Sequence, residues 1–436
     1  MSSAIDTAAP DTLLQEAATA QRAGDYARAR VLFAELLAIA PEQPEALHFT
    51  GLMEYQEGRL AEAVAHVEAA VRQRPQNVDF LNNLGTIYMA NRQMPEALKT
   101  YAKALAFAPA NTGVMTNLAI ALGQLKQFPE AIALLRKVID KQPRSLAAIS
   151  ALGNMLRLSG DLDGALTAYE TYREFAPQDP EAHYNCGVVL QDMWKLEQAA
   201  RAYESAMALK PDVARYYVNH GAALLKLHDI AGAEASYARA VELDPSLAEA
   251  HYNYAICLYL LGRYEEAIQH YEWRLKVDET SLSKPRAVDV PVWNGETLPD
   301  KTILLHSEQG LGDMLQFSRF IPLVAQRFRH VVVEVQKPLV PLFAASYPQA
   351  TVIAKGDDAP AVDVHCPLMS LPPRLGITLE NLPQLTGQPY LAADEERIAA
   401  WKQKLDTRPG RRIAFTWQGN PKALSLIHIS EPTRQA

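Results

Sequence analysis

A glycine-containing turn in the last third of the chain has the sequence of a ligand-binding site. Residues 301–307, KTILLHS, predict a buried strand, which the EQGLGD turn connects to an amphipathic helix at 314–328. Ligands of open α/β sheets bind beyond the carboxyl ends of the strands, near helix N-termini. Gly310 and Gly312 would let a phosphate group or an acceptor molecule approach the backbone. The spacing does not match the GxGxxG pattern, so dinucleotide binding is only weakly indicated.

A second set of chemically capable residues is a column of asparagines, spaced by multiples of 34 residues. Its members are Asn83, Asn117, Asn185, Asn219 and Asn253, and Phe49 and Ala151 occupy two further positions of the register. A primary amide offers two donors and an acceptor, so a row of amides can hold an extended peptide by its backbone. The alternative is that asparagine is simply a common solvent-facing residue at this position.

Evenly spaced prolines reveal the elements that position the asparagines. Every interval is 34 residues in the series Pro41, Pro75, Pro109, Pro143, Pro177, Pro211 and Pro245. This is the period of the tetratricopeptide repeat (TPR), a hairpin of two antiparallel helices. Each proline stands where a second helix must end, because proline lacks a backbone donor and clashes with the preceding turn. Residues 10–282 therefore predict an α-solenoid of eight TPR repeats.

Small and bulky residues recur in the same register. An alanine stands twelve residues before each proline, from Ala29 to Ala233, and a glycine or alanine stands ten residues after it. Small residues let antiparallel helices approach closely, and we expect aromatic residues such as Tyr101 to fill the space between repeats. Stacked repeats form a curved solenoid, and in TPR proteins the first helices line its concave face. We expect a protein or peptide partner in that groove.

The pattern changes beyond the repeats, where a proline-rich linker at 283–300 precedes an α/β domain at 301–410. Further strands are predicted at 330–335, 351–356 and 362–367, and further helices at 338–348 and 395–405. Strands that alternate with helices predict parallel βαβ units in a doubly wound, Rossmann-like sheet. RRIAFTWQG at 411–419 predicts the first strand of another domain, so that residues 411–423 would be its start.

Composition excludes several classes of protein. The net charge of −8 gives no basic footprint for nucleic acid, and no apolar run approaches the length of a membrane span. The first residues lack the features of a secretory signal. Three scattered cysteines argue against a disulfide framework or a zinc site and fit a reducing compartment. The sequence therefore predicts a cytoplasmic protein without a metal or another cofactor.

Two stretches carry a resemblance to glycosyltransferases. NLG at Asn83, NLA at Asn117, NCG at Asn185, NHG at Asn219 and NYA at Asn253 resemble the asparagine ladder in the TPR superhelix of O-linked N-acetylglucosamine transferases. YEWR, PVWNGE and LLHSEQGLGDMLQFSRF look like bacterial fusions of TPR repeats with an inverting GT-B transferase. The turn itself is similar to that of heptosyltransferase-like enzymes, in which a Gly-Asp pair opens the first helix of the acceptor half.

The resemblance implies roles for three side chains. Asp313 would be the base that takes the proton of an acceptor hydroxyl as it attacks the sugar, with His306 and Glu308 as helpers. The donor would be a nucleotide sugar, held by the second half of the enzyme without a metal. Alternatives remain from the residues themselves: Asp313 as a favourable charge at a helix N-terminus, His306 as a structural histidine and Glu308 as a solvated loop charge. Cys366 is expected to be a buried, small apolar residue.

The last residues depart from the family pattern. LSLIHISEPTR at 424–434 looks like a translated sequencing adapter, so residues 424–436 are expected to be a foreign tail and the donor half to be missing. The resemblance therefore predicts a transferase that modifies a protein when full length and is inactive in this form. The alternative is a non-catalytic TPR interaction scaffold, and transfer to glycans is a third possibility.

Overall fold

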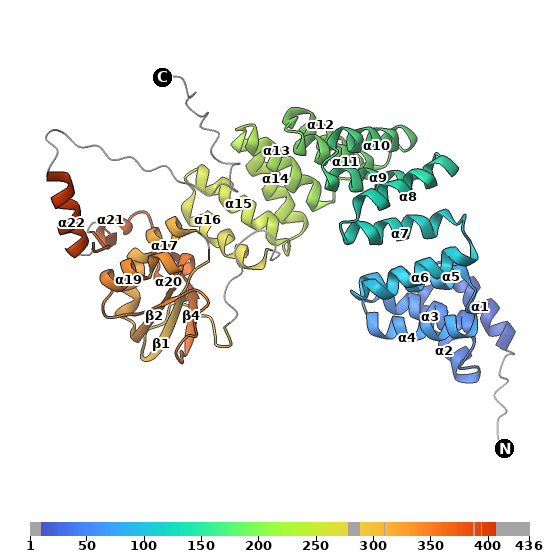
Figure 1. Ribbon diagram of the computed structural model, residues 1–436, viewed down its shortest axis with the longest axis horizontal. Coiled ribbons are helices and arrows are strands. Elements are labelled where there is room, and N and C mark those ends of the chain that lie inside the picture. The colour runs from blue at the N-terminus through green and yellow to red at the C-terminus, as the bar shows by residue number, and fades with distance from the viewer. Residues whose placement is uncertain (1–9, 278–287, 309, 387–388, 394, 407–436) are drawn as a thin grey trace, which may run out of the picture. The chain divides into compact units, whose positions relative to one another are not determined.

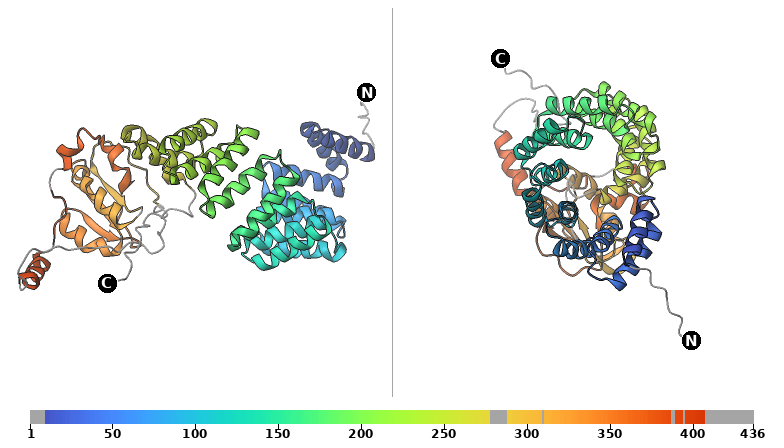
Figure 2. Two further views of the ribbon diagram at one scale, coloured as in Figure 1. Left: turned by 90° about the horizontal axis from the view of Figure 1, so that it is seen from above. Right: turned by 90° about the vertical axis from the view of Figure 1, so that its right-hand side faces the viewer.

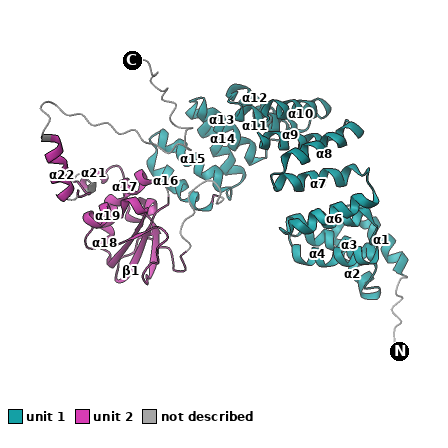
Figure 3. Ribbon diagram, in the orientation of Figure 1, with its two compact units in different colours: residues 1–276 teal, residues 277–436 magenta. Residues whose placement is uncertain are grey.

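The computed structural model describes residues 10–277, 288–308, 310–386, 389–393 and 395–406. It divides the chain into two compact units, residues 1–276 and residues 277–436 (Figure 3). The expected domain start at 411–423 and the expected tail at 424–436 lie outside the described residues.

The first unit is a series of eight antiparallel helical hairpins, as the proline spacing predicts (Figure 1). The first helices of the hairpins are α1 Pro10–Arg22, α3 Pro44–Gln56, α5 Val78–Ala90, α7 Thr112–Gln124, α9 Leu146–Ser159, α11 Pro180–Asp192, α13 Ala214–Lys226 and α15 Ala248–Leu260. The second helices are α2 Tyr26–Ile39, α4 Leu60–Gln73, α6 Met94–Phe107, α8 Phe128–Lys141, α10 Leu162–Phe175, α12 Leu196–Leu209, α14 Ile230–Leu243 and α16 Tyr264–Tyr271, followed by the 3-10 turn η1 Glu272–Lys276.

The prolines end the second helices as predicted. Helix α2 stops at Ile39, two residues before Pro41, and α4 stops at Gln73, two residues before Pro75. The intervening residue is not helical, with φ of −129° and ψ of 79° at Ala40. This conformation follows from the proline ring, which disfavours helical backbone in the residue before it.

The two helices of each hairpin are joined by a tight turn that contains a left-handed residue. Glycine fills this position in four turns, at Gly24, Gly58, Gly160 and Gly262. The other four turns place a side chain there, at Arg92, Lys126, Trp194 and His228, with φ between 59° and 64°. Left-handed backbone strains residues that have a Cβ atom, so these four turns are less favourable than the glycine turns.

The recurring small residues hold the helices of one hairpin together. The alanines from Ala29 to Ala267 are fully buried. A Cβ atom added to Gly85 on α5 would lie 2.5 Å from the ring of Tyr101 on α6. The aromatic ring therefore packs against the glycine of its own hairpin, and our expectation that it fills the space between repeats misses this contact.

The first helices form the inner layer of the solenoid. Successive first helices such as α5 and α7, or α13 and α15, contact each other directly and more extensively than successive second helices do. Hairpins stacked in this way curve toward the layer in which the helices lie closer together. Figure 2 shows the hairpins of this unit arranged around a common axis.

The second unit contains a parallel four-stranded sheet. Its strands are β1 Leu298–His306, β2 Phe328–Val335, β3 Thr351–Ala354 and β4 Val364–Pro367, in the order β3-β2-β1-β4. Ile303 at the centre of β1 pairs with Val331 of β2 and Val364 of β4. These strands confirm the predicted parallel α/β region.

Helices lie between β1 and β2, between β2 and β3, and after β4. They are α17 Leu311–Phe317, η2 Ser318–Phe320, α18 Ile321–Ala325, η3 Lys337–Leu339, α19 Val340–Ser346, η4 Leu368–Ser370, α20 Leu371–Leu375, α21 Leu382–Thr386 and α22 Glu395–Asp406. The helix predicted at 314–328 is broken into α17, η2 and α18. Pro322 stands in the first turn of α18, where its missing N–H and its ring prevent a continuous helix.

The core of this unit includes a tryptophan from the predicted linker. Trp293 is 1% exposed and packs edge-on against Phe328. Its backbone N–H donates to the carbonyl oxygen of His365 (2.8 Å), and its indole N–H donates to the carbonyl oxygen of Glu296 (2.9 Å). The structure thus places the second half of the 283–300 segment within the α/β unit, because residues next to β1 and β4 extend the sheet.

Candidate functional site

The asparagine column lies on the inner layer and bonds to it. All five side chains are half-buried on first helices. Three of the amides donate to the preceding first helix: Asn83 to Nε2 of His48 (2.9 Å), Asn117 to Oδ1 of Asn82 (2.9 Å) and Asn219 to the hydroxyl of Tyr184 (2.7 Å). The ion pair of Arg157 with Asp192 (3.0 Å) links α9 to α11 in the same way. Column residues therefore connect neighbouring repeats, a role that the sequence did not suggest.

Two members of the column have unused hydrogen-bonding capacity. Within the part of the chain that the structure describes, Asn185 and Asn253 make no side-chain hydrogen bond. In other repeats, the residue just before the column position accepts a hydrogen bond from the column amide of the next repeat. On α13 this residue is Val218, which has no polar side-chain atom to accept from Asn253. A half-buried amide with no protein partner bonds to water or to a ligand. The peptide-binding role of the five asparagines stays a prediction, with Phe49 and Ala151 as gaps.

An aromatic and charged cluster lies beside Asn185 and Asn219. The carboxylate of Glu181 accepts a hydrogen bond from the hydroxyl of Tyr216 (2.6 Å) and pairs with the guanidinium of Arg215. That guanidinium lies over the ring of Tyr184, 5.0 Å from its centroid. Burial raises the pKa of the Tyr184 hydroxyl, and the charge of Arg215 partly opposes this shift. Because Glu181 and Arg215 neutralise each other, the cluster presents aromatic and hydroxyl groups more than net charge.

His48 is held neutral by its surroundings. Its side chain is 5% exposed, and its ring stacks on Phe80 with centroids 4.3 Å apart. Burial lowers the pKa of His48 to about 4, although Asp79 and Glu45 act in the opposite direction. Nε2 accepts from the amide of Asn83, which fixes the neutral tautomer with its proton on Nδ1.

The predicted catalytic residues lie at the carboxyl edge of the parallel sheet. His306 ends β1 and is fully buried, and its Nε2 lies 3.0 Å from Nδ1 of His365 on β4. Burial lowers the pKa of His365, which favours the neutral imidazole. Glu308 is 5% exposed, so the alternative of a solvated loop charge is wrong. Cys366 is fully buried, as expected of a small apolar residue.

Asp313 has a structural role in this arrangement. Its carboxylate accepts a hydrogen bond from the backbone N–H of Gly310 (3.1 Å) and stands in the first turn of α17. It makes no other side-chain hydrogen bond within the described residues, so the structure does not join it to His306 or Glu308. This bond favours the helix-capping alternative for Asp313.

Neither glycine of the turn is required by packing against the described residues. A Cβ atom added to Gly312 would have nothing within 4 Å, and one at Gly310 would lie 3.7 Å from the carboxylate of Asp313. The backbone φ of Gly310 is −68°, which other residues adopt readily. The open surroundings are compatible with an approaching ligand. The binding roles of Gly310 and Gly312 remain predictions.

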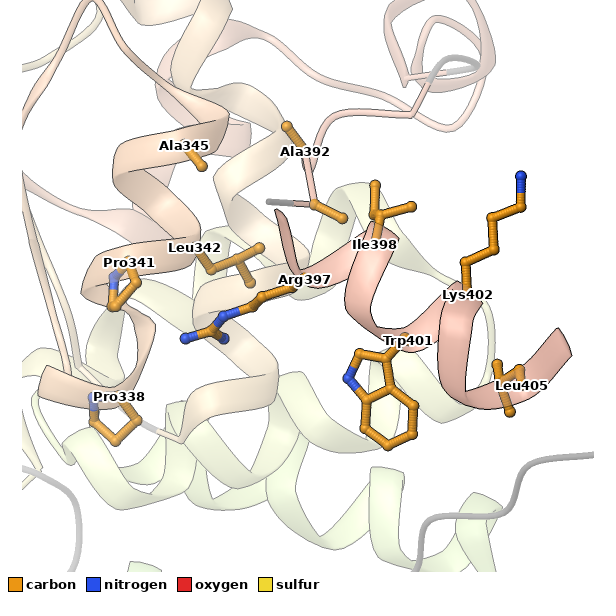
Figure 4. Close-up of a pocket in the computed structure, with 11 residues that line it drawn as sticks. Pro338, Pro341, Leu342, Ala345, Ala392, Arg397, Ile398, Trp401, Lys402 and Leu405 are labelled. Atoms are coloured by element: carbon orange, nitrogen blue, oxygen red, sulfur yellow. The ribbon is translucent and has the colours of Figure 1, made fainter. Parts of the chain in front are cut away.

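A groove of about 700 Å³ in the same unit contains none of the predicted site residues. It lies between α19 and α22, where Leu342 faces Ile398 and Trp401 (Figure 4). Trp401 is 61% exposed. Its lining is mostly apolar, and Arg397 and Lys402 are its charged members. Among the described residues that line this groove there is no carboxylate and no histidine. Within the residues described, no group of three or more His, Cys, Asp or Glu side chains is arranged to hold a metal ion.

Comparison with known families agrees with the repeating hairpins. The sequence profile of a family described as tetratricopeptide repeat matches residues 14–78, 54–112, 116–180, 187–247 and 218–272. The chain belongs to the tetratricopeptide repeat family. All of the matched stretches lie in the first unit of this TPR protein, between α1 and η1.

Individual proteins resemble the TPR protein over parts of its length. Protein FlbA of Caulobacter vibrioides is 26% identical over 202 residues, which cover 40% of this chain and 33% of FlbA. The match therefore spans a third of the length of FlbA. Among solved structures, a tetratricopeptide repeat protein from Parabacteroides merdae is 17% identical with a TM-score of 0.49, covering 57% of this chain and 98% of that one. The pilF protein of Pseudomonas aeruginosa is 19% identical with a TM-score of 0.41, covering 48% and 94%.

Sequence reasoning missed the residues that receive the column's hydrogen bonds. His48, Asn82 and Tyr184 share one register position, immediately before the column position of their own helix. Their residue types differ, so the position carries no repeat signature. The polar character of that position was the available signal. His365 was also missed, because it lies inside a short predicted strand.

Among described residues, no helix has both the length and the apolar character needed to cross a lipid bilayer.

Proposed function

We propose that the TPR unit is an interaction scaffold that binds an extended segment of a partner polypeptide along its inner face. The observation that carries this proposal is the pair of half-buried amides at Asn185 and Asn253, whose donors and acceptors have no partner within the described residues. Amides at such positions can bond to the N–H and C=O groups of a peptide whatever its side chains. Asn83, Asn117 and Asn219 contribute their remaining acceptor oxygens.

The test replaces both unpartnered amides and measures peptide binding. Peptides are selected from a displayed library of random 12-residue sequences, and the affinity of the best one is compared between the native protein and the Asn185→Ala, Asn253→Ala double variant. We expect binding to weaken about tenfold or more, since each lost hydrogen bond is worth roughly 1 kcal/mol. The melting temperature should not fall, because neither amide has a protein partner. The control is Gln198→Ala, an exposed amide on the second helix α12.

Equal binding by the native protein and the double variant would contradict the role of these two amides. Equal weakening by Gln198→Ala would show that the effect is not located on the inner face.

The second candidate function is glycosyl transfer by the α/β unit. Its support is the buried pair of His306 and Glu308 at the carboxyl edge of a parallel sheet, beside the turn that Asp313 closes. In this proposal residues 301–410 are the acceptor half of a GT-B enzyme of Rossmann type, with a nucleotide sugar as the donor substrate. The acceptor would be a protein that the repeats hold, so both candidate functions use the same inner face.

The test of transfer uses a panel of nucleotide sugars and detects sugar addition to proteins by mass spectrometry. The assay is run on this chain and on any longer protein that the gene is found to encode. Transfer that Asp313→Asn abolishes would support the enzyme. Transfer that survives Asp313→Asn would leave this residue as a helix cap only, and absence of transfer from both proteins would favour the scaffold.

A further inference from the structure

The inner layer of the solenoid contains a stretch without charge. Between Asp79 at the start of α5 and Arg157 near the end of α9, the first helices α5, α7 and α9 contain no acidic or basic residue. Helix α7 contains none at all. The next two first helices differ, since α11 carries Glu181 and α13, in the adjacent repeat, carries Arg215. A charged side chain placed over the uncharged stretch of α5, α7 and α9 would lose hydration without meeting a counter-charge from that stretch.

An amide pair stands in the middle of this uncharged stretch. The Asn117 amide nitrogen on α7 donates to Oδ1 of Asn82 on α5, with 2.9 Å between the two atoms. The bond uses the nitrogen of one amide and the oxygen of the other. Two groups remain without any bond: the NH₂ of Asn82, which donates, and Oδ1 of Asn117, which accepts. Both side chains are half-buried, and the structure gives these two groups no other partner among the described residues.

A donor next to an acceptor is the complement of the C=O and N–H groups of an extended backbone. We propose that the Asn82–Asn117 pair binds the backbone of a partner segment that is uncharged where it crosses α5, α7 and α9. Helices pack about 10 Å apart, so three of them span roughly 20 Å, which corresponds to about six extended residues. The inference rests on the proposed inner-face binding and adds a specific clamp and the chemistry of the segment.

The substitution Asn82→Asp separates the clamp from the fold. A carboxylate at position 82 still accepts the hydrogen bond from Asn117, so the link between α5 and α7 is retained. It has no N–H to offer a peptide carbonyl and is otherwise close to asparagine in shape. The matched control is Asn154→Asp, which adds the same charge to a half-buried asparagine on α9 that makes no side-chain hydrogen bond within the described residues.

The experiment selects peptides from the random 12-residue library on the full 436-residue chain and sequences the captured pool. We expect enriched peptides to share an uncharged run of about six residues. Their affinity should fall about tenfold or more for Asn82→Asp and less than threefold for Asn154→Asp, while the added charge changes the melting temperatures of the two variants to a similar extent. Each backbone amide within the run is N-methylated in turn. Methylation of the amide that donates to Oδ1 of Asn117 should weaken binding by a similar factor, because the peptide then lacks this N–H.

The outcomes separate the clamp from the broader proposal. Failure to enrich any peptide would overturn inner-face binding and the clamp together. Enriched peptides that carry charges throughout, or that bind Asn82→Asp as tightly as the native protein, would overturn the clamp alone. Equal weakening by Asn82→Asp and Asn154→Asp would also overturn it, because the effect would then come from added charge and not from the lost donor.

Discussion

The buried histidine between the second and third repeats makes this part of the solenoid sensitive to acid. His48 has its pKa lowered from 6.5 to about 4 by burial. The unfolded chain therefore binds more protons than the folded one between these pH values, and the stability of the folded state falls as the pH falls through this window. Linkage with these two pKa values gives a loss of about 2 kcal/mol between pH 7 and pH 5.

The substitution His48→Asn isolates this contribution, because the neighbouring repeat already contains the replacement. Asn82 occupies the equivalent position there and accepts the same hydrogen bond from the column residue of the following repeat, Asn117. Asparagine at position 48 would keep the acceptor for Asn83 and would not titrate. The variant should be somewhat less stable at pH 7, since the stacking of His48 on Phe80 is lost.

Hydrogen exchange measured by mass spectrometry is the suitable assay, because repeats open locally and each reports its own stability. After correction for intrinsic exchange rates, protection of α3 and α5 in the native protein should fall by about twentyfold from pH 7 to pH 5, and that of His48→Asn should fall much less. The comparison with the variant removes the contributions of other buried histidines such as His220. Equal loss of protection in both proteins would refute the reasoning.

Three further substitutions test the packing and the turns. Lys126→Gly should stabilise the protein by about 0.5–1 kcal/mol, because Lys126 is left-handed with φ of 61° and glycine relieves that strain. Gly85→Ala should destabilise it by about 1–3 kcal/mol, since the new Cβ atom would lie 2.5 Å from the Tyr101 ring. Gln127→Asp should stabilise it by about 1 kcal/mol, because Asp161 caps α10 at the equivalent position and Gln127 provides no side-chain cap for α8. Urea unfolding followed by circular dichroism measures all three.

Each of these substitutions has a matched control. Lys126→Ala keeps a Cβ atom and should give no gain, so an equal gain would show that strain is not the cause. Adding Tyr101→Leu to Gly85→Ala should restore much of the lost stability, since the fourth hairpin combines Ala119 with the buried Leu135. Gln127→Asn should stabilise nearly as much as Gln127→Asp, because asparagine caps as well as aspartate; if only aspartate stabilises, the cause is charge at the helix N-terminus.

The number and boundaries of the repeats could be predicted because they are marked by single residues that recur at fixed positions of each repeat. Proline ends a helix through its own ring, and a glycine such as Gly85 is demanded by the ring that touches it. Both effects depend on one or two residue types at one position, so they repeat visibly. The four turns with side chains at left-handed positions were missed because Arg92 and Trp194 do not share a residue type with Gly58.

The candidate sites were less accessible from the sequence, because they depend on pairs of residues that lie far apart in the chain. The column of asparagines was visible, but its acceptors vary from His48 to Tyr184 and only the fold shows that they meet. His306 was singled out by the motif, whereas its partner His365 lies 59 residues away on β4. The role of Asp313 could not be settled either, since a base and a helix cap stand at the same place.

The hydrogen bonds between successive first helices have a mechanical consequence. Directional bonds fix the spacing along the inner wall at the junctions α3–α5, α5–α7, α9–α11 and α11–α13. Apolar packing has no preferred direction, so the outer helices can shift more easily when the solenoid bends. At these four junctions the inner contour, along which a bound chain would lie, therefore keeps its length better than the outer layer does when the solenoid changes its curvature. The other junctions between first helices are the places where a change of curvature would lengthen or shorten that contour.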